Sequence, residues 1–501
     1  MVIATPGDAD VLLPPVAHNQ TASHVIERLF PKLADLTLAL NTVDDSGFAP
    51  VLAERWERRD SLTIAFTLEA RARWQDGVPI TADDVVFSLD VYRDTLAASP
   101  YAPSLEPVAE ITAENARTAV VRFRRVYPEQ LYDVAYHLYV MPKHLLDSVP
   151  RARLASSTFA RAPVGAGPWR FVRWTPGAEI VVEADTTWFR GRPNLDRLVW
   201  RVLPDVSTAV TALLGGEADA LEVVLQRDDL ERVAGAPALR LVPYASPLMA
   251  GILFNVRRPP WNDRALRRAV AMAVDRETIV RNLFGPYGEV PIGSTSRMQW
   301  IAGAPARQLP FDTLAARAAL DALGWRDANG DGVRERGGRP LRLALLVPTT
   351  SRARQQAAQL VQDQLRRVGV ELRIQPLEFG VFDRRTAAGD FEAMFFSWTL
   401  DPSPVYLAHW WRSGAPDNRG GYASPAFDSL FAEAAAATTR TEALPRWQRV
   451  LEQLNDDAPG VFIYSPRNHA AVARRLDGVT IRPDSWLAMV ASWRLAADAR
   501  P

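Results

Sequence analysis

The 501-residue sequence contains no cysteine, which excludes disulfides, thiolate metal sites and a cysteine nucleophile. It also lacks an apolar run approaching the ~18 residues of a membrane-spanning helix. Its N-terminal segment, MVIATPGDADVLLPP, has neither the basic nor the apolar part of an export signal. A chain without cysteine can fold outside the cytoplasm without any disulfide formation, so its composition is compatible with that location.

Net charge is absent as well, because 58 basic and 58 acidic residues balance. A formally neutral chain gives no electrostatic reason to expect a nucleic-acid or anionic-membrane partner, so we expect no nucleic-acid binding. Lysine is nearly missing, since Lys32 and Lys143 are the only two. The arginines are spread along the chain among acidic residues and do not indicate phosphate recognition.

Motifs of catalysis and cofactor binding are missing too. There is no Gly-x-Ser-x-Gly, His-Glu-x-x-His or Walker loop, and the six histidines lack metal-ligand spacing. Asp327–Gly332 matches the first half of an EF-hand loop, but its twelfth position is Gly338 instead of Glu, which favours a polar turn. We predict no enzyme activity, no cofactor and no metal. A hydrolase with paired carboxylates is the alternative.

The stretch 51–92 contains the clearest local signals. Apolar residues alternate with small or polar ones over Leu62–Leu68, which predicts a half-buried strand. Asp76-Gly77 is a turn dipeptide. Thr81 followed by Asp84 has the spacing of a capping box and predicts the start of a helix.

The rest of the chain alternates between strand and helix patterns, which predicts an α/β fold. A short strand is expected at residues 2–5 and a helix over His24–Leu36. Further on, we expect a helix at Val206–Leu214, a helix capped by Asn262, and a strand at Val461–Tyr464.

Several blocks occur in the order typical of one protein family. They are LAERW, RWQDGVPITADDVVFSL, GAGPW, RGRP, GEAD and FNVRRPPWNDRALRRAVAMAVDRETIV. Together they resemble the family 5 extracytoplasmic solute-binding proteins, the dipeptide-, oligopeptide- and nickel-binding receptors of ABC importers. The resemblance spans about residues 1–490. Because the blocks are ordered, it is more specific than any one motif.

The resemblance implies a two-lobed α/β periplasmic-binding-protein type II fold with an additional inserted α+β domain. Lobe I would comprise residues 1–45, 165–245 and 474–501. Residues 46–164 would form the accessory domain inserted in lobe I, and residues 246–473 would form lobe II.

The implied function is a receptor that captures a short peptide between two lobes by hinge closure and delivers it to ABC permease subunits. We expect a monomer located outside the cytoplasm, with the export signal removed and Met1 added. An oligosaccharide is the alternative solute, because the 15 tryptophans could stack on sugars. Trp74, Trp169 and Trp174, however, lie in scaffold blocks and are expected in the core.

The resemblance places two segments of the first lobe at the ligand. One is His18–Thr21, which contributes the candidate residues Asn19 and Gln20. The other is Ser99–Ala102, in which Tyr101 would contact the peptide backbone. A polar loop with a helix cap is an equal interpretation of the first segment, and a surface-loop tyrosine of the second.

Three candidates come from the second lobe: Trp398 and Asp401 in SWTLD, and Tyr464. The resemblance implies that Asp401 pairs with the α-ammonium of the peptide, although a turn initiated before Pro402 is the alternative. The chain has Phe395 where some relatives carry an arginine near the ligand carboxylate. We therefore expect either a different selection of peptide length or charge, or a solute that is not a peptide.

Overall fold

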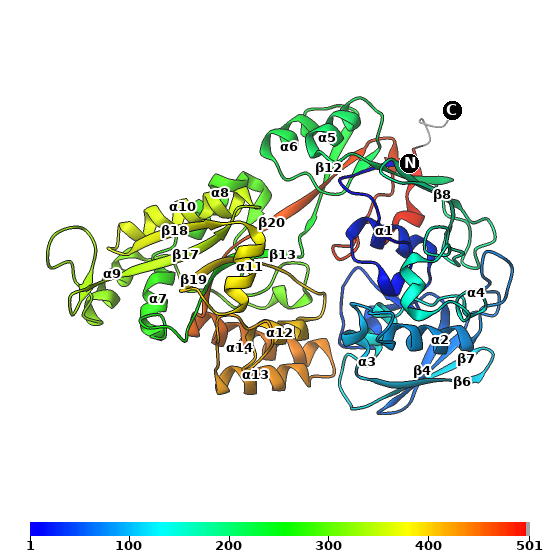
Figure 1. Ribbon diagram of the computed structural model, residues 1–501, viewed down its shortest axis with the longest axis horizontal. Coiled ribbons are helices and arrows are strands. Elements are labelled where there is room, and N and C mark those ends of the chain that lie inside the picture. Colours follow the sequence, from blue (N-terminus) through cyan, green and yellow to red (C-terminus); the bar gives the residue numbers. More distant parts are fainter. Residues whose placement is uncertain (497–501) are drawn as a thin grey trace. The chain divides into compact units, whose positions relative to one another are not determined.

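The computed structural model describes residues 1–496, so residues 497–501 of the predicted first lobe lie outside the described part. The chain forms two compact units (Figure 1). Unit 1 comprises Met1–Tyr244 and the chain from Asn468 onward, and unit 2 comprises Ala245–Arg467. The separation of residues 46–164 as a further domain stays a prediction.

Unit 1 combines two main sheets and two short two-stranded sheets, β2-β3 and β21-β22, with short helices. Its strands are β1 (Val2–Thr5), β2 (Ala34–Leu36), β3 (Phe48–Pro50), β4 (Ala53–Asp60), β5 (Thr63–Leu68), β6 (Val108–Asn115), β7 (Thr118–Phe123), β8 (Trp169–Thr175), β9 (Glu179–Ala184), β10 (Arg197–Val202), β11 (Ala220–Leu221), β21 (Leu476–Asp477) and β22 (Arg494–Leu495). Its α-helices are α1 (Gln20–Leu29), α2 (Ala82–Arg93), α3 (Gln130–His137), α4 (Lys143–Leu146), α5 (Val206–Leu214) and α6 (Arg227–Ala234). Short 3-10 turns occur at Pro14–Val16, Asp45–Gly47, Ala102–Leu105, Arg151–Ser156 and Val490–Ser492.

The larger sheet of unit 1 has the strand order β11-β1-β10-β9-β8. The strands β1, β10 and β11 run parallel, whereas β9 and β8 add antiparallel strands at one side. The carboxyl ends of the three parallel strands therefore lie at one edge, where loops of open α/β sheets bind ligands.

The second sheet of unit 1 is antiparallel, with the order β4-β5-β7-β6. The strand predicted at Leu62–Leu68 is β5, and α2 packs against β6 and β7 of this sheet (Figure 1). The capping box of α2 forms as expected: the backbone N–H of Thr81 donates to Asp84 Oδ2 at 2.8 Å. Gly77 adopts a φ of +91° in the preceding turn, which a side chain would disfavour.

The helix predicted over His24–Leu36 is wrong at both ends. The helix α1 begins at Gln20, because Asn19 caps it by accepting from the Ala22 N–H at 2.9 Å. It ends at Leu29, because the residue before Pro31 is pushed out of helical geometry and Phe30 is extended.

Unit 2 is an α/β unit with one main sheet. Its strands are β13 (Leu248–Phe254), β14 (Gly288–Glu289), β15 (Glu335–Arg336), β16 (Arg339–Pro340), β17 (Arg342–Pro348), β18 (Glu371–Leu377) and β19 (Ala393–Thr399). Its α-helices are α7 (Arg264–Met272), α8 (Arg276–Phe284), α9 (Thr313–Ala322), α10 (Arg352–Arg366), α11 (Phe379–Ala387), α12 (Ala408–Trp411), α13 (Pro425–Ala435) and α14 (Arg440–Asp457). Its 3-10 turns are Gly285–Tyr287, Trp300–Gly303 and Pro404–Leu407.

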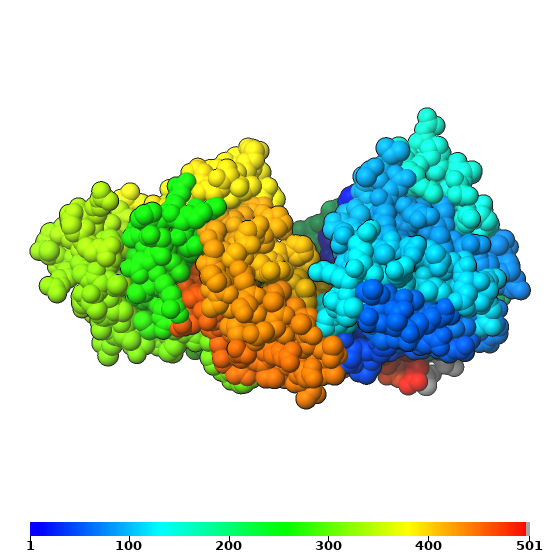
Figure 2. Space-filling model, turned by 90° about the horizontal axis from the view of Figure 1, so that it is seen from below, coloured from blue at the N-terminus to red at the C-terminus, as the bar shows by residue number. Residues whose placement is uncertain are grey.

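The main sheet of unit 2 has the order β18-β17-β19-β13, with β20 (Gly460–Ala473) paired beside β13. The strands β17, β18 and β19 run parallel, so their carboxyl ends share one edge. The helices α7, α8, α9 and α10 contribute buried apolar residues to the hydrophobic core on one face. In the space-filling view, α13 and α14 (orange) make up much of the visible surface of unit 2 (Figure 2).

Two elements differ from the prediction, one in where the strand ends and one in which residue caps the helix. The strand expected at Val461–Tyr464 continues to Ala473, so β20 and β12 (Leu239–Ala245) carry the chain between the units. The helix expected to be capped by Asn262 is capped instead by Asp263, whose carboxylate accepts from the Ala265 N–H at 2.9 Å.

Within residues 1–496, no helix is long and apolar enough to cross a membrane.

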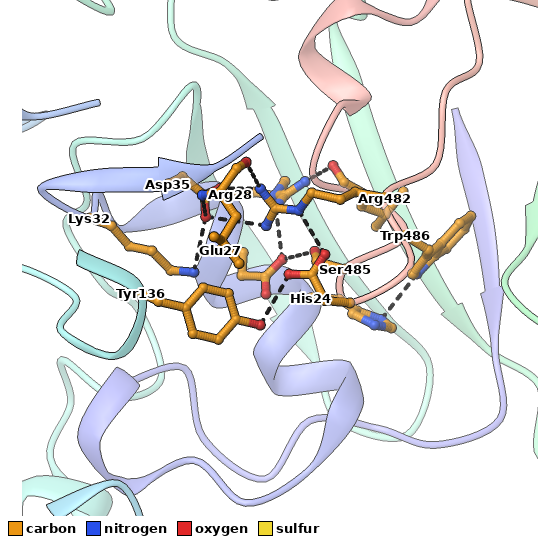
Figure 3. A network of polar contacts seen from close by, with 12 residues as sticks. His24, Glu27, Arg28, Lys32, Asp35, Tyr136, Arg482, Ser485 and Trp486 are labelled. Atoms are coloured by element: carbon orange, nitrogen blue, oxygen red, sulfur yellow. Dashed lines mark hydrogen bonds and ion pairs between the residues drawn. The ribbon is translucent and has the colours of Figure 1, made fainter. Parts of the chain in front are cut away.

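A buried network of ion pairs joins the two chain segments of unit 1 (Figure 3). Arg482 donates to Asp484 Oδ1 at 2.7 Å and to Asp35 Oδ1 at 3.2 Å, and it also donates to the Leu36 carbonyl. Its side chain is 2% exposed. Burial would raise the pKa of Asp35, but the charges of Lys32 and Arg482 hold it down at about 2.

Replacing Arg482 by methionine should leave two carboxylates in this network without their guanidinium. We expect the free energy of unfolding to fall by ~3–5 kcal/mol, because breaking a buried pair leaves an uncompensated charge. Urea unfolding followed by tryptophan fluorescence measures this. The matched control is Arg494→Met, which removes an exposed pair with Asp477 (2.7 Å) and should cost about 1 kcal/mol or less. Equal losses in the two variants would contradict the prediction.

Candidate functional site

The edge of unit 1 where β1, β10 and β11 end holds the first group of polar side chains. The loop after β1 leads to Asn19 and Gln20, and Glu222 directly follows β11. The Gln20 amide nitrogen donates to both carboxylate oxygens of Glu222, at 2.9 and 3.1 Å. Of the two predicted residues, Gln20 therefore takes part in a polar cluster at this edge.

Asn19 has a structural role in the same turn. Its side-chain oxygen caps α1, and its amide nitrogen donates to the Asp8 carbonyl at 3.0 Å. These contacts correspond to the helix-cap interpretation of the sequence. A ligand contact by Asn19 stays a prediction.

His24 extends the cluster along α1. Its Nε2 lies 3.7 Å from Glu222 Oε2, and its Nδ1 accepts from the Trp486 indole N–H at 3.5 Å. Figure 3 shows this indole contact. Burial lowers the pKa of His24, more than Glu222 raises it, and so favours the neutral ring. Burial likewise raises the pKa of Glu222.

Tyr101 lines a separate cavity of about 180 Å³ inside unit 1. Its ring packs edge-on against Tyr92, with centroids 6.5 Å apart. Burial raises the pKa of Tyr101. The side chain of Tyr101 thus lines an aromatic cavity, while its backbone lies in a turn after α2, and a ligand contact by Tyr101 stays a prediction. The cavity lining consists of Pro14, Ala17, Ser23, Ile26, Glu27, Lys32, Tyr92, Tyr101, Tyr136, His137 and Tyr139.

Lys32 is the buried cation of this cavity. Its ammonium lies 4.2 Å from the ring centre of Tyr136 and 4.9 Å from that of Tyr139, a cation–π arrangement. It also lies 3.6 Å from Asp35. Burial, assisted by the Lys32 charge, lowers the pKa of the neighbouring His137 to about 3.

The second group of candidates follows β19 in unit 2. Trp398 is 2% exposed and packs among Phe396, Trp411 and Phe462. Asp401 lies two residues beyond the strand end and is partly exposed. Trp398 is therefore a buried packing residue, whereas Asp401 lies just beyond the carboxyl end of β19.

The contacts of Asp401 order a turn. Its Oδ1 accepts from the Ser403 N–H at 2.8 Å, and its backbone carbonyl accepts from the Gln299 amide at 2.8 Å. This corresponds to the alternative of a turn initiated before Pro402. Gln299 is buried and was not a candidate, because its contact with Asp401 spans 102 residues of chain.

Tyr464 lies in the core of unit 2, 3% exposed and packed against Phe284 and Phe395. A register shift between β13 and β20 at Ala250 re-aims this side chain, as β-bulges do. Phe395 and Trp398 point to opposite faces of β19 because side chains alternate along a strand. Tyr464 and Trp398 therefore do not share a face.

A second cavity, of about 550 Å³, lies in unit 2, and none of the predicted residues lines it. It is lined by the loop 414–423, the end of α11 and Arg257.

Among residues 1–496, no group of three or more His, Cys, Asp or Glu side chains is placed to hold a metal ion.

Glu222 is the site residue that sequence reasoning missed. It comes three residues after the GEAD block, at the carboxyl end of a strand. The rule that ligands meet open α/β sheets at strand ends would have pointed to it. Its partners Gln20 and His24 precede it by about 200 residues, so the pairing itself left no local signal.

The model of bacterial extracellular solute-binding proteins, family 5 Middle, matches residues 47–419. The chain belongs to this family. Among the relatives of this family 5 protein, the oligopeptide-binding protein AppA of Bacillus subtilis is 28% identical over 457 residues, covering 89% of this chain and 83% of AppA. The probable D,D-dipeptide-binding periplasmic protein DdpA of Escherichia coli is 23% identical over 498 residues, covering 96% of this chain and 92% of DdpA.

Solved structures confirm the fold of this family 5 protein. The ABC transporter substrate-binding protein CtaP of Listeria monocytogenes superimposes with a TM-score of 0.85 at 22% identity, over 99% of both chains. AppA of Bacillus subtilis in complex with a nonapeptide gives a TM-score of 0.78 at 24% identity, over 99% of this chain and 98% of that one. The predicted periplasmic-binding-protein type II fold is therefore confirmed.

The low pKa of His137 predicts that stability falls with acidification. The buried ring stays neutral down to about pH 3, whereas an unfolded histidine binds a proton below about pH 6.5. The free energy of unfolding that depends on the neutral ring is therefore fully present above pH 6.5 and is lost progressively toward pH 3. Urea unfolding measures the free energy of unfolding at pH 7 and at pH 5. Its decrease between these two pH values should be about 1–2 kcal/mol smaller in His137→Gln than in the wild type. The exposed His18→Gln should retain the wild-type loss, and an unchanged loss in His137→Gln would contradict the assignment.

Proposed function

We propose that this protein is the solute-binding receptor of an ABC importer, which captures a short peptide outside the cytoplasm and delivers it to a membrane permease. The observation that carries the proposal is the match to the oligopeptide-binding protein AppA over 89% of this chain. DdpA, which matches over 96% of the chain, is also named for a peptide ligand. The solved AppA structure holds a nonapeptide.

A receptor without catalytic activity is supported by the sequence. The chain has none of the nucleophile, metal or nucleotide motifs sought above, and the relatives are named as binding proteins. The tryptophans expected in the core give little support to an oligosaccharide. Trp74 and Trp169 are 1% and 0% exposed, so their rings pack inside unit 1, whereas Trp174 is partly exposed.

Within this function, Asp401 is proposed to bind the α-ammonium of the peptide. It is partly exposed and lies beyond the carboxyl end of β19, at the edge that three parallel strands share. The Ser403 N–H fixes one carboxylate oxygen at 2.8 Å, which restricts the rotation of the side chain. A pre-oriented carboxylate loses less conformational freedom when it binds a cation.

Mass spectrometry of the solute that co-purifies with the protein tests the receptor proposal. We expect peptides, which the protein returns intact and at no more than equimolar amounts after incubation. An oligosaccharide would overturn the peptide assignment. Cleavage of added peptide beyond the stoichiometry of the protein would overturn the receptor assignment.

Calorimetry with Asp401→Asn tests the assigned carboxylate. Affinity for a co-purified peptide with an unblocked amine should fall about 30-fold or more, because truncating one partner of a buried charge pair costs ~2–5 kcal/mol. The N-acetylated form of the same peptide should bind variant and wild type equally. Asp417→Asn, an exposed change on the following loop, is the control. A loss below about threefold for the amine-bearing peptide would show that Asp401 does not bind it.

A further inference from the structure

Glu222 holds an acidic charge at the carboxyl end of β11 that no described basic side chain neutralises. Its only hydrogen-bond donor among residues 1–496 is the neutral amide of Gln20. The nearest titratable partner is His24 at 3.7 Å, whose burial favours the neutral ring. Neither partner brings a full positive charge to the carboxylate.

Three buried carboxylates of this protein have a cation beside them. Asp219 lies beside Arg475, Asp484 beside Arg482, and Asp229 beside Arg232 at 2.9 Å. Burying a charge costs free energy unless it is paired, so these pairs are the expected solution. Glu222 differs in its partners: its carboxylate contacts the Gln20 amide and lies near His24, and no described arginine or lysine pairs with it.

Glu222 is also accessible and held in place. Its side chain is 23% exposed, against 4% for Asp219 and 2% for Asp484. The Tyr244 hydroxyl donates to its backbone carbonyl at 3.2 Å. The Gln20 amide bonds both carboxylate oxygens and fixes the plane of the group. A fixed, accessible carboxylate can accept further charge-assisted hydrogen bonds from a ligand.

We propose that Glu222 binds a cationic nitrogen group of the solute, an ammonium or a guanidinium, so that the protein selects basic peptides. This inference rests on the proposed function and specifies the class of peptide. The cation would give Glu222 the kind of pairing that Asp219, Asp229 and Asp484 find within the chain. The cationic group belongs to a basic side chain, because Asp401 is proposed for the α-ammonium. A chemical change at the side chain and one at the N-terminus of the peptide distinguish the two sources.

A library of tri- to pentapeptides, incubated with the folded protein and analysed by mass spectrometry after removal of unbound peptide, tests the proposal. At each position the library carries Lys, Arg, norleucine or Gln, and each peptide is present with an unblocked and an acetylated N-terminus. Norleucine keeps the apolar stem of lysine and lacks its charge. The variant is Glu222→Gln, which keeps the size of the side chain. The control is Glu217→Gln, an exposed position before the same strand.

We expect wild type and Glu222→Gln to differ at least about tenfold for one set of cationic peptides and to bind their uncharged counterparts equally. Loss for Lys and Arg peptides relative to norleucine supports a basic side chain as the partner of Glu222, whereas loss only for unblocked N-termini would overturn the selection of basic peptides. Glu217→Gln should match wild type. Peptides bound without any preference for a cationic group, or an equal loss for charged and uncharged peptides, would overturn this inference alone. A folded protein that retains no peptide would overturn the proposed function together with it.

Discussion

Unit 1 depends on a buried guanidinium contributed by the far end of the chain. Arg482 lies between Asp35 and Asp484 and also binds the carbonyl of Leu36, so the C-terminal segment is tied to the chain that follows α1. Nearby, Arg28 of α1 donates to the carbonyl of Leu487. These charges can stay buried only while every partner is present, because an unpaired buried charge is costly. The position of α1 is therefore set by residues more than 400 positions away.

This constraint reaches the candidate site through α1. Gln20 opens the helix and holds Glu222, while His24 lies one turn later and accepts from Trp486 of the tied segment. A shift of α1 would move both side chains away from the end of β11. The buried ion pairs thus orient the polar cluster at the end of β11.

Both units place their partly exposed carboxylates at the same kind of location. Glu222 follows a strand of the parallel group β1, β10 and β11, and Asp401 follows a strand of the parallel group β17, β18 and β19. At such ends the backbone leaves the sheet, so side chains become accessible while the strands keep them rigid. The aromatic candidates Trp398 and Tyr464 lie within strands and are buried there instead.

Local chemistry determined much of what the sequence by itself predicted. The capping box of Thr81 and Asp84, the turn at Gly77 and the helix Val206–Leu214 all follow from interactions within a few residues, and they formed as expected. The family was also evident, because its blocks are contiguous and ordered.

Tertiary structure decided the candidate site. Glu222 meets Gln20 across 202 residues, and a register shift beside β13 turns Tyr464 into the core. Such contacts depend on how distant strands and helices pack, and no local pattern of side chains encodes that geometry.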